Sequence, residues 1–224
     1  MPAPTELSEV TDIVVTALPR RRKHFSMVRE FHLADFFTLG NAACGMGSVF
    51  FAMSFMSSRL LDDFYISAAL APAAFIFDVL DGRIARWRHE HSILGRELDS
   101  LADVISFGVG PAALAFAAGM SGGWDMAILM YFVCCGVSRL ARYNVTAETL
   151  SAGAEKVAYF EGTPIPTSVA LTAVLAIAAW QDRLGVNMWG GAMQLGPWTW
   201  HPLSLMFLAS GTAMISKTLR IPKL

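Results

Sequence analysis

Charged residues are scarce in this sequence: Lys, Arg, Asp and Glu make up 16% of 224 residues, whereas a soluble domain carries about 25%. Cysteine is rarer still. Cys44, Cys134 and Cys135 all lie in apolar stretches, so neither a disulfide framework nor a metal-ligand spacing is indicated, and we expect buried structural thiols. The net charge of −1 gives no reason to expect a nucleic-acid partner.

Hydrophobic residues are abundant, at 54% of the chain, and fall into blocks long enough to span a bilayer. We therefore predict an all-α polytopic membrane protein; a soluble domain with an unusually large core is the alternative. The six expected transmembrane helices cover residues 36–56, 66–87, 98–119, 124–145, 163–181 and 201–217. Around them we expect a flexible cytosolic tail (1–23), an amphipathic interfacial helix (24–35), a six-helix domain (36–217) and a basic cytosolic C-terminus (218–224).

The basic residues indicate the orientation in the membrane. Of the 17 Lys and Arg residues, all but Arg59 and Arg183 fall on the side that holds both termini when the chain crosses six times. Cytosolic loops carry an excess of Lys and Arg. The sequence therefore predicts that both termini face the cytosol, together with the segment between the second and third spans.

That segment carries four regularly spaced aspartates within DVLDGRIARWRHEHSILGRELDSLAD. Asp78 and Asp81 share one helix face at the end of the second span, and Asp99 and Asp103 share another at the start of the third. Four carboxylates at membrane depth repel one another and are costly, so they are expected to be functional. Two divalent cations, Mg²⁺ or Mn²⁺, would balance them. Protonated aspartates on a proton path, or scattered exposed carboxylates, are the alternatives.

Small residues accompany the aspartates. Gly82 and Ala85 lie one turn after Asp78 and Asp81, where they clear a groove for a flat base or a phosphate; each alone also suits ordinary helix packing. Arg86 lies on the same stripe and can meet an anionic group. His89 and His91, in the turn, can serve as metal ligands, although solvent-facing loop histidines are the simpler interpretation.

The whole pattern resembles the signature of the CDP-alcohol phosphatidyltransferase family at every fixed position. The matching residues are Asp78, Asp81, Gly82, Ala85, Arg86, Gly95, Asp99 and Asp103. Members of that family are six-helix membrane enzymes, usually dimers, that move a phosphatidyl or similar group from a CDP-linked donor to an alcohol. The resemblance implies that the four aspartates hold two metal ions and that Asp103 is the general base. It also implies that Asp81, Gly82, Ala85, Arg86 and Gly95 contact the CDP moiety.

Three further segments resemble the phosphatidylserine synthases of the fungal and bacterial membrane type within that family. They are SRLARYNVTAE (138–148), YFEGTPIPTSVA (159–170) and HFSMVREFHLADFFTLGNAACG (24–45). This resemblance implies CDP-diacylglycerol as donor and L-serine as acceptor, in the endoplasmic reticulum of a eukaryote or the inner membrane of a bacterium. Ala34-Asp35 replaces the family's Pro-Asn, and Tyr143 replaces a Phe. Thr38 and Asn41 still match and are expected to line the nucleotide site.

The polar residues of these segments suit an amino-acid acceptor. Arg139 and Arg142 are neighbours on one helix face and can bind a carboxylate or a lipid phosphate; they also fit as topology charges. Tyr143 and Asn144 follow directly, and Glu161 can pair with an ammonium group or cap its loop. Another acceptor, such as glycerol phosphate, inositol phosphate or choline, stays open, as does an ion or proton carrier that uses the aspartates.

Overall fold

Long apolar runs form helices at all six predicted places. The computed structural model describes residues 33–88, 93–151, 159–216 and 220–222, all within the unit His32–Leu224. The α-helices of the described residues are α3 (Leu33–Ser58), α4 (Leu61–Arg88), α5 (Ile93–Asp103), α6 (Gly110–Ala118), α7 (Gly123–Ser151), α8 (Val169–Trp180) and α9 (Leu205–Ile215). A π-helical segment, η1 (Val104–Val109), joins α5 to α6 without a break. The chain is therefore mostly helical, as predicted.

Four helical stretches are long and apolar enough to cross a membrane. They are Ala34–Ser58, Leu61–Ile84, Leu94–Ala118 and Gly123–Thr146. The fifth and sixth predicted spans are also helical but shorter, at Ile165–Trp180 and Pro202–Ile215. Each begins with a 3₁₀ turn, η2 (Ile165–Ser168) and η4 (Pro202–Ser204).

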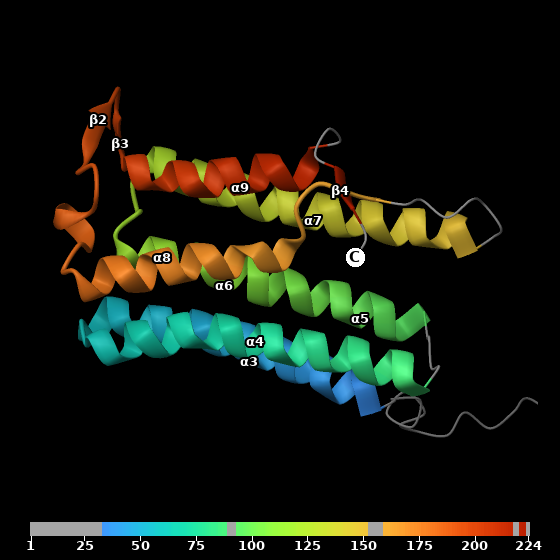
Figure 1. Ribbon diagram of the computed structural model, residues 1–224. Coiled ribbons are helices and arrows are strands. Elements are labelled where there is room, and N and C mark those ends of the chain that lie inside the picture. Colours follow the sequence, from blue (N-terminus) through green and yellow to red (C-terminus); the bar gives the residue numbers. More distant parts are fainter. Residues whose placement is uncertain (1–32, 89–92, 152–158, 217–219, 223–224) are drawn as a thin grey trace, which may run out of the picture. The chain divides into compact units, whose positions relative to one another are not determined.

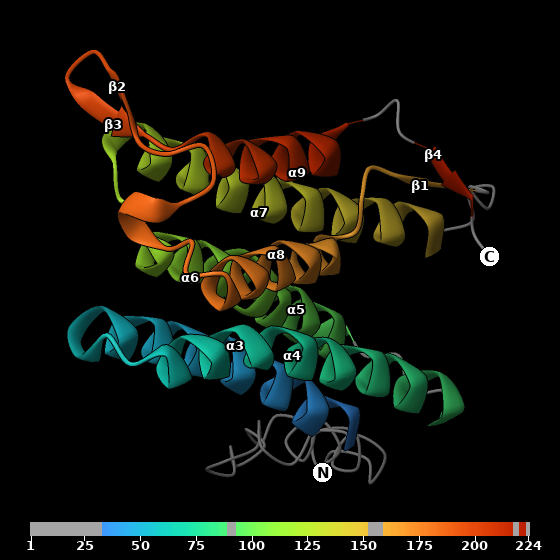
Figure 2. The same cartoon turned by 60° about the vertical axis from the view of Figure 1, so that its left-hand side comes forward.

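The helices pack mainly in pairs (Figures 1 and 2). Helices α3 and α4 lie side by side, α7 lies against α9, and α8 contacts α4 and α6. The buried core contains Phe64, Phe107, Leu114, Phe132 and Phe207, which come from four of the helices and from η1. Inside a bilayer such contacts are stabilised by close van der Waals packing, because lipid tails are as apolar as these side chains.

Two short antiparallel sheets were not predicted. One pairs β1 (Tyr159–Glu161) with β4 (Arg220–Pro222), and the other is the hairpin of β2 (Met193–Leu195) and β3 (Trp198–Trp200). They lie at opposite ends of the helices (Figure 1). We call the end where α4 ends and α5 begins the site end, and the end that carries β2 and β3 the hairpin end. A third short 3₁₀ turn, η3 (Gly185–Asn187), lies in the connection before the hairpin.

Several expectations change or fall outside the described residues. The predicted interfacial helix, 24–35, is described only from residue 33, and those last residues begin α3. The tail 1–23 and the two turn histidines, His89 and His91, lie outside the described part of the chain. The cysteines are free, as expected, but Cys134 is exposed and only Cys135 is buried, because adjacent helix positions face different sides.

Candidate active site

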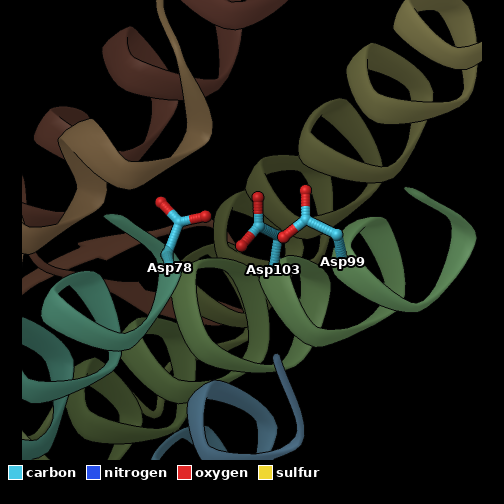
Figure 3. A group of neighbouring side chains, drawn as sticks. All are labelled: Asp78, Asp99 and Asp103. Carbon is cyan, nitrogen blue, oxygen red and sulfur yellow. The ribbon is translucent and has the colours of Figure 1, made fainter. Parts of the chain in front are cut away.

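Three of the predicted carboxylates meet at the site end. Asp78 comes from α4, and Asp99 and Asp103 come from α5, with a carboxylate oxygen of each within 4.8 Å of the others. Figure 3 shows the three side chains pointing to the same side of the two helices, with Asp103 between Asp78 and Asp99. The spacing of four residues places Asp99 and Asp103 one turn apart on the same face of α5, as expected.

This group has the chemistry of a divalent-cation site. All its donors are carboxylate oxygens, which hard ions such as Mg²⁺ and Mn²⁺ prefer. Oδ1 of Asp99 is buried and has no hydrogen-bond partner among the described residues. Because a buried polar atom without a partner costs about 1–3 kcal/mol, an ion bound there would satisfy the atom and offset the repulsion. The residues present therefore fit a metal.

Asp81 lies beside the group but is held separately. Its Oδ2 accepts a hydrogen bond from Thr38 Oγ1 at 2.8 Å, and only 6% of the residue is exposed. A fifth acid, Asp35 in the first turn of α3, is buried and close enough to Asp81 for an electrostatic interaction. In the sequence, Asp35 stands out only as a departure from the family pattern. Nothing in its local sequence shows that the start of α3 faces Asp81.

Helix α3 also contacts Asp103. Asn41 is fully buried, and its Nδ2 donates to Asp103 Oδ1 at 3.1 Å. The backbone carbonyl of Asn41 accepts a hydrogen bond from Ser106 Oγ, in η1, at 2.8 Å. Thr38 and Asn41, predicted as nucleotide contacts, therefore bind the carboxylates themselves in this structure.

The small residues leave α4 open near the aspartates. A Cβ built on Gly82 would have one neighbouring atom within 4 Å, Nη2 of Arg86 at 4.0 Å. Arg86 itself is exposed, one turn along the helix. Gly95 lies in the first turn of α5, and Ala85 lies in α4, but the side chain of Ala85 is outside the described part. Packing among the described residues therefore does not require a glycine at Gly82.

Helix α7 supplies a positive charge to the same end. Arg139 is partly buried, its Nε has no hydrogen-bond partner among the described residues, and its charge interacts with Asp103. Arg142 and Tyr143 are exposed. Arg139 is thus the less exposed member of the arginine pair and has an electrostatic interaction with Asp103.

Asn144, predicted to contact the acceptor or the lipid phosphate, contacts α5 in this structure. Its amide donates to both oxygens of Glu97 at 3.3 Å and to Ser100 Oγ at 3.0 Å, which ties α7 to α5. Glu97 and Ser100 were not singled out from the sequence, where no motif marks them. Glu161 lies on β1, but its side chain is outside the described residues.

Comparison with known proteins places the chain among phosphatidyltransferases. The family model of the CDP-alcohol phosphatidyltransferases matches residues 31–206. The chain is 42% identical over 207 residues to a Saccharomyces cerevisiae protein named CDP-diacylglycerol–serine O-phosphatidyltransferase, covering 89% of this chain and 74% of the yeast one.

Bacterial proteins with the same name match over shorter parts of their length. A Mycobacterium leprae protein is 33% identical over 187 residues, which are 82% of this chain and 58% of that protein. A Helicobacter pylori protein is 37% identical over 145 residues, which are 64% of this chain and 56% of that protein. The chain thus spans less than two thirds of these bacterial relatives. The matched family model covers every described carboxylate of the site end, and the chain belongs to the CDP-alcohol phosphatidyltransferase family.

Proposed function

We propose that this integral membrane protein transfers the phosphatidyl group from CDP-diacylglycerol to L-serine, giving phosphatidylserine and CMP. The observation that carries the proposal is the group formed by Asp78, Asp99 and Asp103, in a chain 42% identical to a yeast protein named for this reaction. The group supplies the chemistry shared by the family, and the names of the relatives supply the acceptor.

Asp78, Asp81, Asp99 and Asp103 would together hold two divalent cations, Mg²⁺ or Mn²⁺, which when bound neutralise charge on the donor's phosphates and on the departing CMP. Gly82 leaves the surface of α4 open, so that the nucleotide can approach the backbone there. Arg86, Gly95 and Ala85 line the same part of the two helices and complete the proposed CDP contacts.

Asp103 is the proposed general base. It accepts the proton of the serine hydroxyl while that oxygen bonds to the phosphorus attached to the lipid, and the phosphorus–oxygen bond to CMP breaks. Arg139, which has an electrostatic interaction with Asp103, holds the carboxylate of serine or the lipid phosphate. A single in-line displacement is the simplest scheme. We place no covalent nucleophile in it.

The membrane arrangement follows from the same proposal. The two shorter helices, Ile165–Trp180 and Pro202–Ile215, also cross the bilayer, giving six spans with both termini and the site end in the cytosol. The acyl chains of the donor stay in the bilayer, and serine enters from the cytosol. We also expect a homodimer, as in other members of the family.

The test uses purified protein with CDP-diacylglycerol, Mn²⁺ or Mg²⁺ and labelled serine. We expect labelled phosphatidylserine and equal amounts of CMP. Replacement of Asp103 by Asn lowers kcat at least about 100-fold, in line with loss of a general base, whereas Asp62→Asn, an exposed carboxylate at the hairpin end of α4, leaves it unchanged. Faster turnover with glycerol phosphate, inositol phosphate or choline than with serine would overturn the acceptor assignment.

A further inference from the structure

Two neutral side chains of α3 each hold one carboxylate from a different helix. Thr38 Oγ1 donates to Asp81 Oδ2 of α4 at 2.8 Å, and Asn41 Nδ2 donates to Asp103 Oδ1 of α5 at 3.1 Å. Thr38 and Asn41 are three residues apart and so share a face of α3. One helix face therefore contacts both pairs of aspartates.

These contacts are deeply buried. Thr38 is 3% exposed and Asn41 is not exposed at all, while Asp81 and Asp103 are 6% and 7% exposed. A carboxylate oxygen bound in such a place is fixed, because water does not compete for it and the donor has little room to change rotamer. With divalent cations bound, each acceptor would be a charged carboxylate, which makes the bond stronger than a neutral pair.

The backbone of α3 is fixed to the segment that follows Asp103. Ser106 Oγ donates to the Asn41 carbonyl at 2.8 Å, and Gly45 lets the two backbones approach closely: a Cβ there would lie 2.6 Å from the Ser106 Cα. Ser106 lies in the π-helical segment η1, an irregularity that frequently occurs at functional sites. Asn41 is thus connected to the Asp103 region through both its backbone and its side chain.

We propose that Thr38 and Asn41 are positioning residues that hold Asp81 and Asp103 at the spacing required for metal binding and catalysis. This inference rests on the proposed function and assigns these residues a role other than contact with the nucleotide. Each takes one oxygen of its carboxylate, and we expect the second oxygen to bind the ion or the substrate. Residues that orient metal ligands in this way typically contribute 10–100-fold to metal affinity or activity.

The test compares Thr38→Val and Asn41→Leu with the wild-type chain in lipid nanodiscs. Val and Leu keep approximately the shape of the original side chains but cannot donate a hydrogen bond. Mn²⁺ affinity is measured without substrate by electron paramagnetic resonance, and kcat and KM are measured with CDP-diacylglycerol and serine. We expect Mn²⁺ affinity and kcat to fall about 10–100-fold, while KM for CDP-diacylglycerol changes less than about two-fold.

Two further variants separate positioning from general damage to the fold. Thr38→Ser keeps the hydroxyl and is expected to restore wild-type values. Ser48→Ala removes another buried hydrogen bond between α3 and α4, to Ser67, but away from the carboxylates, and is expected to leave Mn²⁺ affinity unchanged. If Asn41→Leu does not fold, as judged by its unfolding midpoint, the comparison of Thr38→Val with Thr38→Ser decides alone.

A ten-fold rise in KM for CDP-diacylglycerol with unchanged Mn²⁺ affinity would overturn the proposal and assign the two residues to the nucleotide. Unchanged Mn²⁺ affinity and unchanged kinetics would overturn it as well. The proposed function fails by a different result, namely wild-type protein that forms no phosphatidylserine, and the Mn²⁺ titration does not depend on that outcome.

Discussion

At the scale of single residues, the hairpin end is held by a buried pair, Asp125 and His201. Asp125 is completely buried; its Oδ1 accepts from the His201 backbone N–H at 2.9 Å, and its Oδ2 lies 2.6 Å from His201 Nδ1. The Gly122 N–H donates to the same carboxylate at 3.2 Å. Asp125→Ala leaves the two buried groups of His201 and the partly buried Gly122 N–H without their acceptor, so we expect a loss of about 3 kcal/mol or more in the free energy of unfolding.

Thermal unfolding in detergent measures this loss, and Asp63→Ala is its matched control. Asp63 also accepts two side-chain hydrogen bonds, from Ser54 at 2.7 Å and Ser58 at 2.8 Å, but in an exposed position. We expect its removal to change the unfolding midpoint far less. Because the pair lies at the opposite end from the carboxylates, the folded Asp125→Ala protein keeps wild-type KM values; a large rise in KM would contradict this separation.

The sequence predicted the aspartates better than their partners. Asp99 and Asp103 share a face because of a spacing inside one helix, which the helical repeat alone determines. The bonds from Thr38 to Asp81 and from Asn41 to Asp103 depend instead on how α3 crosses α4 and α5. No local pattern encodes that crossing. The hydrogen bond from Asn144 to Glu97 was not predicted for the same reason, because the two residues are 47 positions apart and meet only when α7 packs against α5.

At the scale of elements, the contact between α3 and η1 depends on one glycine. A Cβ on Gly45 would lie 2.6 Å from the Cα and 2.7 Å from the N of Ser106, so a backbone would have to move. We expect Gly45→Ala to destabilise the protein by about 1–3 kcal/mol, as overpacking does. Since Asn41 is one turn away on the same helix, we also expect a lower kcat.

Gly47→Ala on the same helix is the control for Gly45→Ala. Its Cβ would approach only the end of the flexible Leu70 side chain, at 3.1 Å, which can move aside. Both substitutions bring the same gain in helix propensity, so the difference between the two unfolding midpoints isolates the contact with Ser106. Equal midpoints for the two variants would show that this crossing tolerates a methyl group.

Helices were predictable from the sequence where a long apolar segment is enough to specify them. Four of the predicted spans correspond to helices long enough to cross a membrane, and the other two are helical. The pairing of β1 with β4 was missed because each strand has only three residues and its partner lies far away in the sequence. The π-helical segment η1 was missed because its residues also suit an ordinary apolar helix.

At the scale of the whole molecule, the alternating direction of the helices places the carboxylates at one end and the β2–β3 hairpin at the other (Figure 1). Basic residues concentrate in the segments that the sequence assigns to the site end. A charged nucleotide donor and a polar acceptor both require access to water, whereas the acyl chains require lipid. A site at the end of the membrane-spanning helices meets both requirements, because it lies where the bilayer meets the aqueous phase.

The number of crossings decides on which side the hairpin lies. If Ile165–Trp180 and Pro202–Ile215 both span the bilayer, Gln194 of the hairpin faces the side opposite to Val145 near the end of α7; if neither does, both residues face the cytosol. With the three native cysteines replaced by alanine, Gln194→Cys in intact cells or sealed, right-side-out vesicles should react with a membrane-impermeant maleimide. Val145→Cys should react only after permeabilisation. If both positions react only after permeabilisation, the chain crosses the membrane four times and the six-span arrangement is refuted. If Val145→Cys alone reacts before permeabilisation, the site end faces outward and the predicted orientation is wrong.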